Sequence, residues 1–160
     1  IIERRINGVA AGIGEPVFDK LDALLSHAVM SIGAVKAVEI GDGTAVSKSH
    51  GSENNDEFII KNGIISKKTN HSGGILGGMS DGNEIILRAY VKPTPSIYKT
   101  QNTVNKDNQD IEINIKGRHD PVVVPRAVVV VESMCAFTLL DLMMSNMHSK
   151  AENVIKFYAK

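Results

Sequence analysis

The sequence predicts an α+β fold in which helices cover one face of an antiparallel sheet. Two observations point to this class. Several short segments alternate apolar and polar side chains, as half-buried strands do, and two longer segments carry apolar residues at helical spacing. Their order is strand, helix, strand, strand, strand, helix. At 160 residues the chain has the length of one domain, so we expect residues 1–160 to form a single α+β unit.

The first part of the chain predicts a strand, a helix and a second strand. Residues 1–7 alternate in the manner of a strand. Pro16 suits the first position of a helix, and apolar residues then recur at helical spacing until Gly33 ends the pattern. Residues 34–40 form the second predicted strand, which ends at a glycine.

The middle of the chain is polar. Residues 44–70 are dominated by Ser, Lys, Asn, Asp and Gly, with one apolar island at residues 58–60. Segments of this length without regular structure are usually lids or mobile loops, so we expect a long flexible loop at 44–70. The next predicted strand covers residues 84–91, and a polar connection follows at residues 97–110.

The last third predicts a half-exposed strand at residues 111–115, a valine run through Val131, and a helix from about Glu132 to His148. Apolar side chains leave little of this helix polar, so it should be buried on more than one side. Its methionines are interpreted as core filling. One sheet is not enough to cover such a helix. We therefore expect a further layer from chain that precedes Ile1, because the sequence starts inside a strand and without methionine.

Composition excludes several classes of function. Eighteen basic residues balance eighteen acidic ones, which argues against nucleic acid or an anionic membrane as a partner, so any anion site must be local. No membrane span or signal peptide is predicted, and Cys135 reads as a buried structural thiol in a reducing, cytoplasmic setting. The five histidines show no metal-ligand spacing, so no metal is predicted.

The most informative motif is Gly117-Arg118-His119-Asp120-Pro121, which precedes an apolar segment. A cation, an imidazole and a carboxylate in this position cost stability unless partners or a ligand satisfy them. Pro121 keeps the backbone of Asp120 extended, because the residue before a proline avoids the helical region. The alternative interpretation is a polar turn that caps the following helix.

Three further motifs are candidate ligand contacts, each with a structural alternative. The Gly73–Gly78 segment lets a ligand approach the backbone, or it is a tight turn before the next strand. Lys92-Pro93-Thr94-Pro95-Ser96 offers an ammonium and two hydroxyls on a stiff backbone, which suits a phosphate, or it terminates a strand. Gly33-Ala34 leaves room for a flat ring, or it is a glycine helix stop.

Together these segments resemble the chorismate synthase family. The resemblance covers nearly the whole chain and is carried by residues 14–22, 30–41, 70–78, 92–97 and 117–126. It matches only the C-terminal part of the family's enzyme, somewhat under half of it. It implies a β-α-β sandwich, with helices between two antiparallel sheets, and a homotetramer of the whole enzyme.

The resemblance also implies an activity. The family is a lyase of the shikimate pathway for aromatic amino acids. It converts 5-enolpyruvylshikimate 3-phosphate into chorismate by a 1,4-anti elimination of phosphate, and requires reduced FMN although there is no net redox change. NADPH enters as the expected reductant of the flavin, but these residues do not say whether the parent protein carries out that reduction itself.

Site residues are carried over from the family one position at a time. Gly33 and Ala34 match a flavin-contacting pair, and Gly77 matches a glycine that touches FMN. The segment that holds the cofactor corresponds to Lys92, Pro93, Thr94, Pro95 and Ser96. Arg118 matches an arginine beside flavin and substrate, and Asp120 matches a carboxylate close to flavin N5, which makes it the predicted catalytic residue.

The chain departs from the family pattern in two ways. Gly33 and Val122 stand where other residues are more usual, but neither change removes a functional group. The family's Gly-Glu-Ser-His-Gly and Arg-Ser-Ser-Ala-Arg-Glu motifs are not among these 160 residues, so the isolated chain is expected to be inactive. The alternative function is a non-catalytic module that binds a phosphorylated ligand or a partner.

Overall fold

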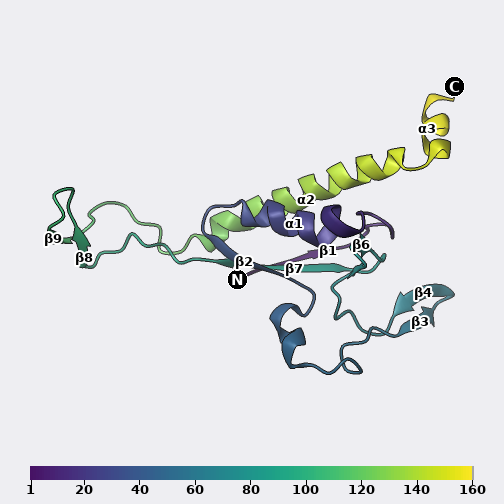
Figure 1. The fold of residues 1–160 in the computed structure, drawn as a ribbon, viewed down its shortest axis with the longest axis horizontal. Coiled ribbons are helices and arrows are strands. Elements are labelled where there is room, and N and C mark those ends of the chain that lie inside the picture. The colour runs from purple at the N-terminus through teal and green to yellow at the C-terminus, as the bar shows by residue number, and fades with distance from the viewer. Residues whose placement is uncertain (160) are drawn as a thin grey trace.

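The central element is a three-stranded antiparallel sheet with two helices on one face (Figure 1). The computed structural model describes residues 1–159. The sheet has the order β1 (Ile2–Ile6), β7 (Ile85–Val91), β2 (Val35–Ile40), so β7 lies in the middle. The covering helices are α1 (Leu21–Met30) and α2 (Val124–His148). The predicted α+β class is confirmed.

The core lies between the sheet and these two helices. Alternate residues of β7 face the helices and are fully buried, as period-two strands require. Residues of α1 and α2 spaced three to four apart meet them from the other side. The core side chains that these three elements contribute are Leu21, Leu25, Val29, Ile85, Leu87, Ala89, Ala127, Val131, Cys135, Leu139 and Leu142. The buried position of Cys135 confirms its interpretation as a structural thiol.

The first helix begins later than the sequence predicted. Residues Val17–Asp19 form a separate 3-10 turn, and Val17 has a φ of +73°, which a continuous right-handed helix does not allow. The α-helix starts at Leu21, whose N–H donates to the carbonyl of Gly78 at 2.7 Å. Pro16 therefore precedes a turn instead of starting the helix.

The second correction concerns the valine run, which belongs to the helix. α2 begins at Val124, not near Glu132, and Pro125 lies in its first turn, where a missing N–H costs little. Ala127 and Val131 lie one turn apart and are both buried, so packing against the core overrides the β-preference of the valines.

Residues 44–70 contain more regular structure than predicted. A 3-10 helix, η2 (Gly43–Lys48), is followed by the hairpin of β3 (Phe58–Lys61) and β4 (Ile64–Lys67). Asn62 and Gly63 both have positive φ, which matches a two-residue hairpin turn. The flexibility of this segment stays a prediction.

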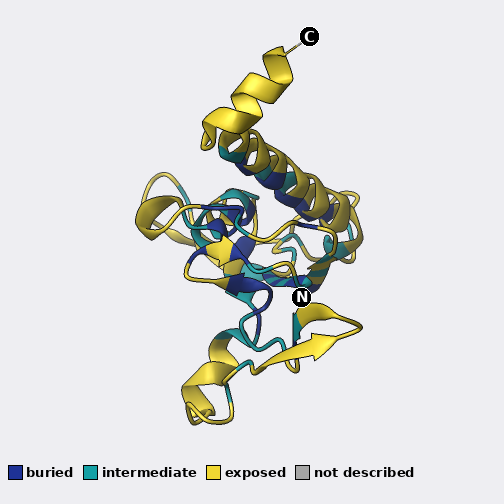
Figure 2. Cartoon of the chain, turned by 90° about the vertical axis from the view of Figure 1, so that its right-hand side faces the viewer, coloured by how far each residue is buried: buried dark blue, intermediate teal, exposed yellow. Residues whose placement is uncertain are grey.

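Three other small elements complete the chain. β5 (Ile75–Leu76) and β6 (Met79–Ser80) form a short hairpin beside the start of β7, and β8 (Gln101–Val104) pairs with β9 (Asp110–Ile113). Part of the predicted polar connection is thus a strand. The β8–β9 hairpin extends away from the sheet (Figure 1), and α3 (Ala151–Tyr158), which was not predicted, is exposed along its length (Figure 2).

The outer face of α2 is apolar and exposed. It carries Val128, Val129, Phe137, Leu140, Met143, Met144 and Met147. Three of these are methionines that were expected to fill a core, so in this chain the helix is buried on one side only. The need for a further layer, predicted from the sequence, persists in the structure.

Among residues 1–159, α2 is also the helix whose length and apolar composition would allow it to cross a membrane. The sequence did not predict this property, because the valine run was not assigned to the helix. A core helix of a soluble protein passes the same test, and α2 contributes several residues to the core. This property alone therefore does not indicate a membrane span.

Candidate functional site

The sheet topology brings two of the predicted motifs together. β2 and β7 are antiparallel neighbours with Val35 opposite Val91, so the residue before β2 meets the residue after β7. The N–H of Lys92 accordingly donates to the carbonyl of Ala34 at 2.7 Å. Ala34 has a φ of +70°, which turns the chain from the end of α1 into β2.

A surface hollow of about 380 Å³ opens where these segments meet. Its lining residues are Ala34, Lys36, Lys92, Pro93, Thr94, Pro95 and Val123. Two ammonium groups thus flank a surface made largely of proline and aliphatic side chains. Lys36 was not singled out from the sequence, although its place two residues after Ala34 on β2 could have indicated that it shares this edge.

A second hollow of about 220 Å³ adjoins the first, because both are lined by Thr94. Its other lining residues are Ser96, Ile97, Tyr98, His119, Asp120 and Pro121. The Lys92–Ser96 segment and the Gly117–Pro121 run, which are about twenty positions apart in the sequence, therefore converge. Asp120 is partly exposed and forms an ion pair with Arg126 in the first turn of α2.

Tyr98 holds the Gly117–Pro121 run in place and was not predicted as a site residue. Its hydroxyl donates to the carbonyl of Gly117, and its ring lies edge-on to His119 with centroids 4.5 Å apart. His119 Nε2 is 3.0 Å from the carbonyl oxygen of Ile115. Arg118 is exposed and is not among the lining residues of either hollow.

Gly33 lies next to the first hollow in the chain, and a Cβ built on it would meet no atom within 4 Å. The same is true of Gly77, whose φ is +60°. The two glycines nevertheless lie far apart. Gly77 belongs to the loop beside the start of β7 and of α1, whereas Lys92 follows the end of β7. The length of β7 therefore places Gly77 about 20 Å from Lys92.

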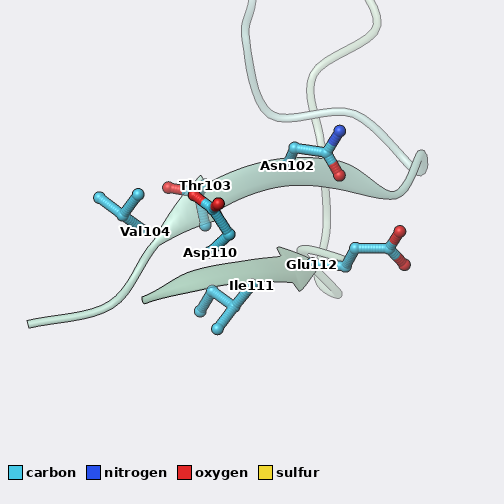
Figure 3. A pocket seen from close by; sticks show the side chains of 6 residues that line it. All are labelled: Asn102, Thr103, Val104, Asp110, Ile111 and Glu112. Carbon is cyan, nitrogen blue, oxygen red and sulfur yellow. The ribbon is translucent and has the colours of Figure 1, made fainter. Parts of the chain in front are cut away.

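Two other observations bear on binding. A larger hollow of about 630 Å³ lies on the β8–β9 hairpin, but it is lined only by that hairpin and contains none of the predicted site residues (Figure 3). Within residues 1–159 no group of three or more His, Cys, Asp or Glu side chains is arranged to hold a metal ion.

Comparison with known proteins assigns the family. The family model described as chorismate synthase matches residues 1–144. The chain belongs to the chorismate synthase family. The chorismate synthase of Lachnospira eligens is 60% identical over 160 residues, which is 100% of this chain and 44% of that protein. That of Lachnoclostridium phytofermentans is 64% identical over 161 residues, again 100% of this chain and 44% of the relative.

A solved structure supports the same assignment. A crystal structure of chorismate synthase superposes with a TM-score of 0.72 at 29% identity, over 91% of this chain and 37% of that one. The resemblance predicted from the sequence motifs is thus confirmed, as is the fold class. The chain spans less than half the length of these relatives.

Proposed function

We propose that these residues are the C-terminal part of a chorismate synthase. The whole enzyme would convert 5-enolpyruvylshikimate 3-phosphate into chorismate and phosphate with reduced FMN. The single observation that carries this proposal is the convergence of the Lys92–Ser96 segment and Asp120 on two hollows that share Thr94.

The first hollow fits a phosphorylated cofactor. Lys36 and Lys92 bring positive charge to a protein whose net charge is zero, and such local charge is what a phosphate needs. The hydroxyl of Thr94 adds a donor on a backbone that two prolines stiffen, and the hydroxyl of Ser96 lies at the adjoining second hollow. Gly33 and Ala34 leave space at the edge of this hollow, where a ring system would lie. When bound, the reduced flavin would supply electron density to the substrate as phosphate leaves.

Asp120 is the proposed proton-handling group. Pro121 restricts its backbone and Arg126 orients its carboxylate, so the side chain is held at the second hollow before any ligand arrives. A carboxylate so placed can accept and return a proton during the elimination. The exposed guanidinium of Arg118 is available to a phosphorylated substrate.

Of the proposed site residues, Gly77 lies farthest from the first hollow. It lies at the far end of β7, so its contact with FMN is a separate element of the proposal and needs its own test. Its open Cβ position and positive φ leave the backbone accessible to a ligand.

We further propose a cytoplasmic homotetramer that acts on a small molecule, without a nucleic-acid or membrane partner. The exposed apolar face of α2 supports burial against more protein, and the balanced charge offers no attraction to polyanions. Residues 1–160 alone should show no turnover. NADPH is the proposed reductant of the flavin, and these residues do not assign the step to this protein.

The test is Asp120→Asn in the complete gene product that contains this chain. The variant keeps the shape of the side chain and loses its basicity, so turnover should fall by about 10²- to 10⁴-fold while FMN and substrate affinity stay within a few-fold. Asp110→Asn, which changes an exposed carboxylate on the β8–β9 hairpin, is the matched control and should keep full turnover. Near-normal turnover in the Asp120→Asn variant would leave Asp120 as a hinge residue only.

A further inference from the structure

A buried ionic cluster lies away from the two hollows and has no role in the proposed chemistry. Lys67, at the end of β4, is a buried charged residue. Its ammonium ion-pairs with Asp56 at 3.4 Å and with Asp81, and its Nζ donates to the hydroxyl of Ser72 at 2.7 Å. The side chains of Lys67, Asp56 and Asp81 are only 1%, 5% and 8% exposed.

Asp56 binds the backbone that leads into the glycine-rich loop. One carboxylate oxygen accepts hydrogen bonds from the N–H of His71 and the hydroxyl of Thr69, both at 2.8 Å. The other accepts from the N–H of Ser72 at 3.0 Å and also faces Lys67. Both oxygens are therefore saturated by donors from one short stretch of chain.

Asp81 makes the corresponding contacts after the loop. One of its oxygens accepts from the backbone and the side chain of Asn83, both at 2.9 Å. The other is beside the Lys67 ammonium, which neutralises it. The N–H of Asp81 donates to the carbonyl of Gly74 at 3.0 Å. A single ammonium thus connects the residues before and after the Gly73–Gly78 loop.

The glycines of this loop divide into two kinds. At Gly73, Gly74 and Gly78 an added Cβ would lie 2.4–2.6 Å from neighbouring atoms, so these positions are closed by packing. At Gly77 an added Cβ would meet nothing within 4 Å. Among the glycines of this loop, Gly77, the position proposed to touch FMN, is therefore the one with open space around it.

Burying three charges costs several kcal/mol per ion and is often no better for stability than a well-packed apolar cluster. A role in selecting one conformation of the chain explains such a cluster better than a contribution to stability does. Because Gly77 lies far from the Lys92 hollow, that hollow gives the loop no support. The shape of the loop depends on contacts made by the residues next to it. Asp56 accepts hydrogen bonds from Thr69, His71 and Ser72, and Lys67 donates to the hydroxyl of Ser72.

From this we infer that Lys67, Asp56 and Asp81 are positioning residues, which hold the Gly73–Gly78 loop in the one conformation that presents Gly77 to the flavin. The part of this inference that concerns the flavin rests on the proposed function. The part that concerns the loop does not, because it is a statement about the conformation of residues 70–81.

The test is Asp56→Asn in the complete gene product, read by hydrogen exchange and by FMN binding. An amide NH₂ group at either oxygen position would face a donor, so at least one of the present contacts must break. We expect the amides of residues 71–78 to exchange at least tenfold faster while amides of α1 and β7 are unchanged. The dissociation constant of FMN should rise at least tenfold.

The neighbouring pair on the same hairpin supplies a matched control. Glu57 and Lys68 form an ion pair at 3.0 Å, one position along from Asp56 and Lys67, but both side chains are more than half exposed. Glu57→Gln should change neither exchange nor FMN affinity. If Asp56→Asn does not fold, Ser72→Ala removes the hydroxyl that accepts from Lys67, keeps the backbone N–H groups that donate to Asp56, and should accelerate exchange of the same amides several-fold.

The outcomes separate the two proposals. Unchanged exchange in residues 71–78, or equal acceleration of all amides, would overturn the positioning role. A loosened loop with unaltered FMN affinity would overturn its connection to the cofactor. If the unmodified protein binds no FMN at all, the proposed function fails, and the exchange data still decide whether the cluster fixes the loop.

Discussion

Gly77→Ala, compared with Gly74→Ala, is the sharpest test of the proposed cofactor contacts. Both glycines have positive φ, 60° and 77°, so alanine at either costs about 1–2 kcal/mol of stability in the left-handed region. Ala34 already adopts a φ of +70° in this chain, which shows that the fold accommodates such a residue. At Gly77 no further cost arises, because the added methyl group meets no atom.

At Gly74 the methyl group would lie 2.5 Å from the carbonyl oxygen of Glu84, which is backbone at the start of β7 and has little freedom to shift. We therefore expect Gly74→Ala to lose distinctly more stability than Gly77→Ala. The assay is urea unfolding of both variants in the complete gene product, followed by FMN titration of the folded ones. Gly77→Ala should stay within about 2 kcal/mol of the parent and bind FMN at least tenfold more weakly.

Two results would refute this reasoning. Equal stability losses in the two variants would mean that the space around Gly77 is not open. A folded Gly77→Ala variant with unaltered FMN affinity would remove Gly77 from the cofactor site.

Three further predictions concern charge and protonation. Lys92→Ala should weaken FMN binding by about 1.5–3 kcal/mol, which is the contribution of a charge-assisted hydrogen bond. Lys106→Ala, on the β8–β9 turn, is the control. An unchanged dissociation constant of FMN in the Lys92→Ala variant would contradict a cofactor role for Lys92. Burial raises the pKa of Cys135 to about 11, so iodoacetamide should modify the thiol only after unfolding, and rapid labelling of the native protein would contradict its burial. Burial alone would raise the pKa of Asp56, but hydrogen bonds from Ser72 and His71 outweigh it and hold that pKa below its ordinary value of 3.8. The ionised carboxylate therefore stabilises the native state above about pH 4, and this contribution is lost as the pH falls further. Asp56→Asn should reduce the loss of melting temperature in acid, and parallel pH profiles for the two proteins would contradict this.

The sequence was most informative where one face of an element is buried. The strands β1 and β7 alternate because their inner residues pack on α1 and α2, so period-two patterns located these two. β2 shows no regular alternation of burial, because its register shifts between Val35 and Ala37. Such patterns failed where packing opposes local preference. The run Val128–Val131 has the composition of a strand, yet it is helical because Ala127 and Val131 fit the core one turn apart.

In the candidate site, too, local sequence patterns predicted some features and missed those that depend on tertiary contacts. The motifs at Lys92–Ser96 and Gly117–Pro121 were visible because proline, glycine and charge stand out locally. The pairing of β2 with β7 brings Ala34 to Lys92, and Tyr98 connects the Gly117–Pro121 run to the same region. Local patterns specify neither contact. The cluster around Lys67 was missed for a related reason. Its members lie in a polar segment and are separated by 11 to 25 positions, so nothing in the sequence distinguishes a buried lysine there from a solvated one.

The pairing of β2 with β7 has a consequence for how the family can vary. The first hollow forms at the end of the sheet where β2 begins at Val35 and β7 ends at Val91. Residues 41–84, which connect the two strands, leave the sheet at its opposite end. Insertions or deletions near the tip of the β3–β4 hairpin would therefore change the outline of the molecule without moving Ala34 relative to Lys92. Length differences among relatives should collect at that tip, while the spacing from Val91 to Ser96 stays fixed.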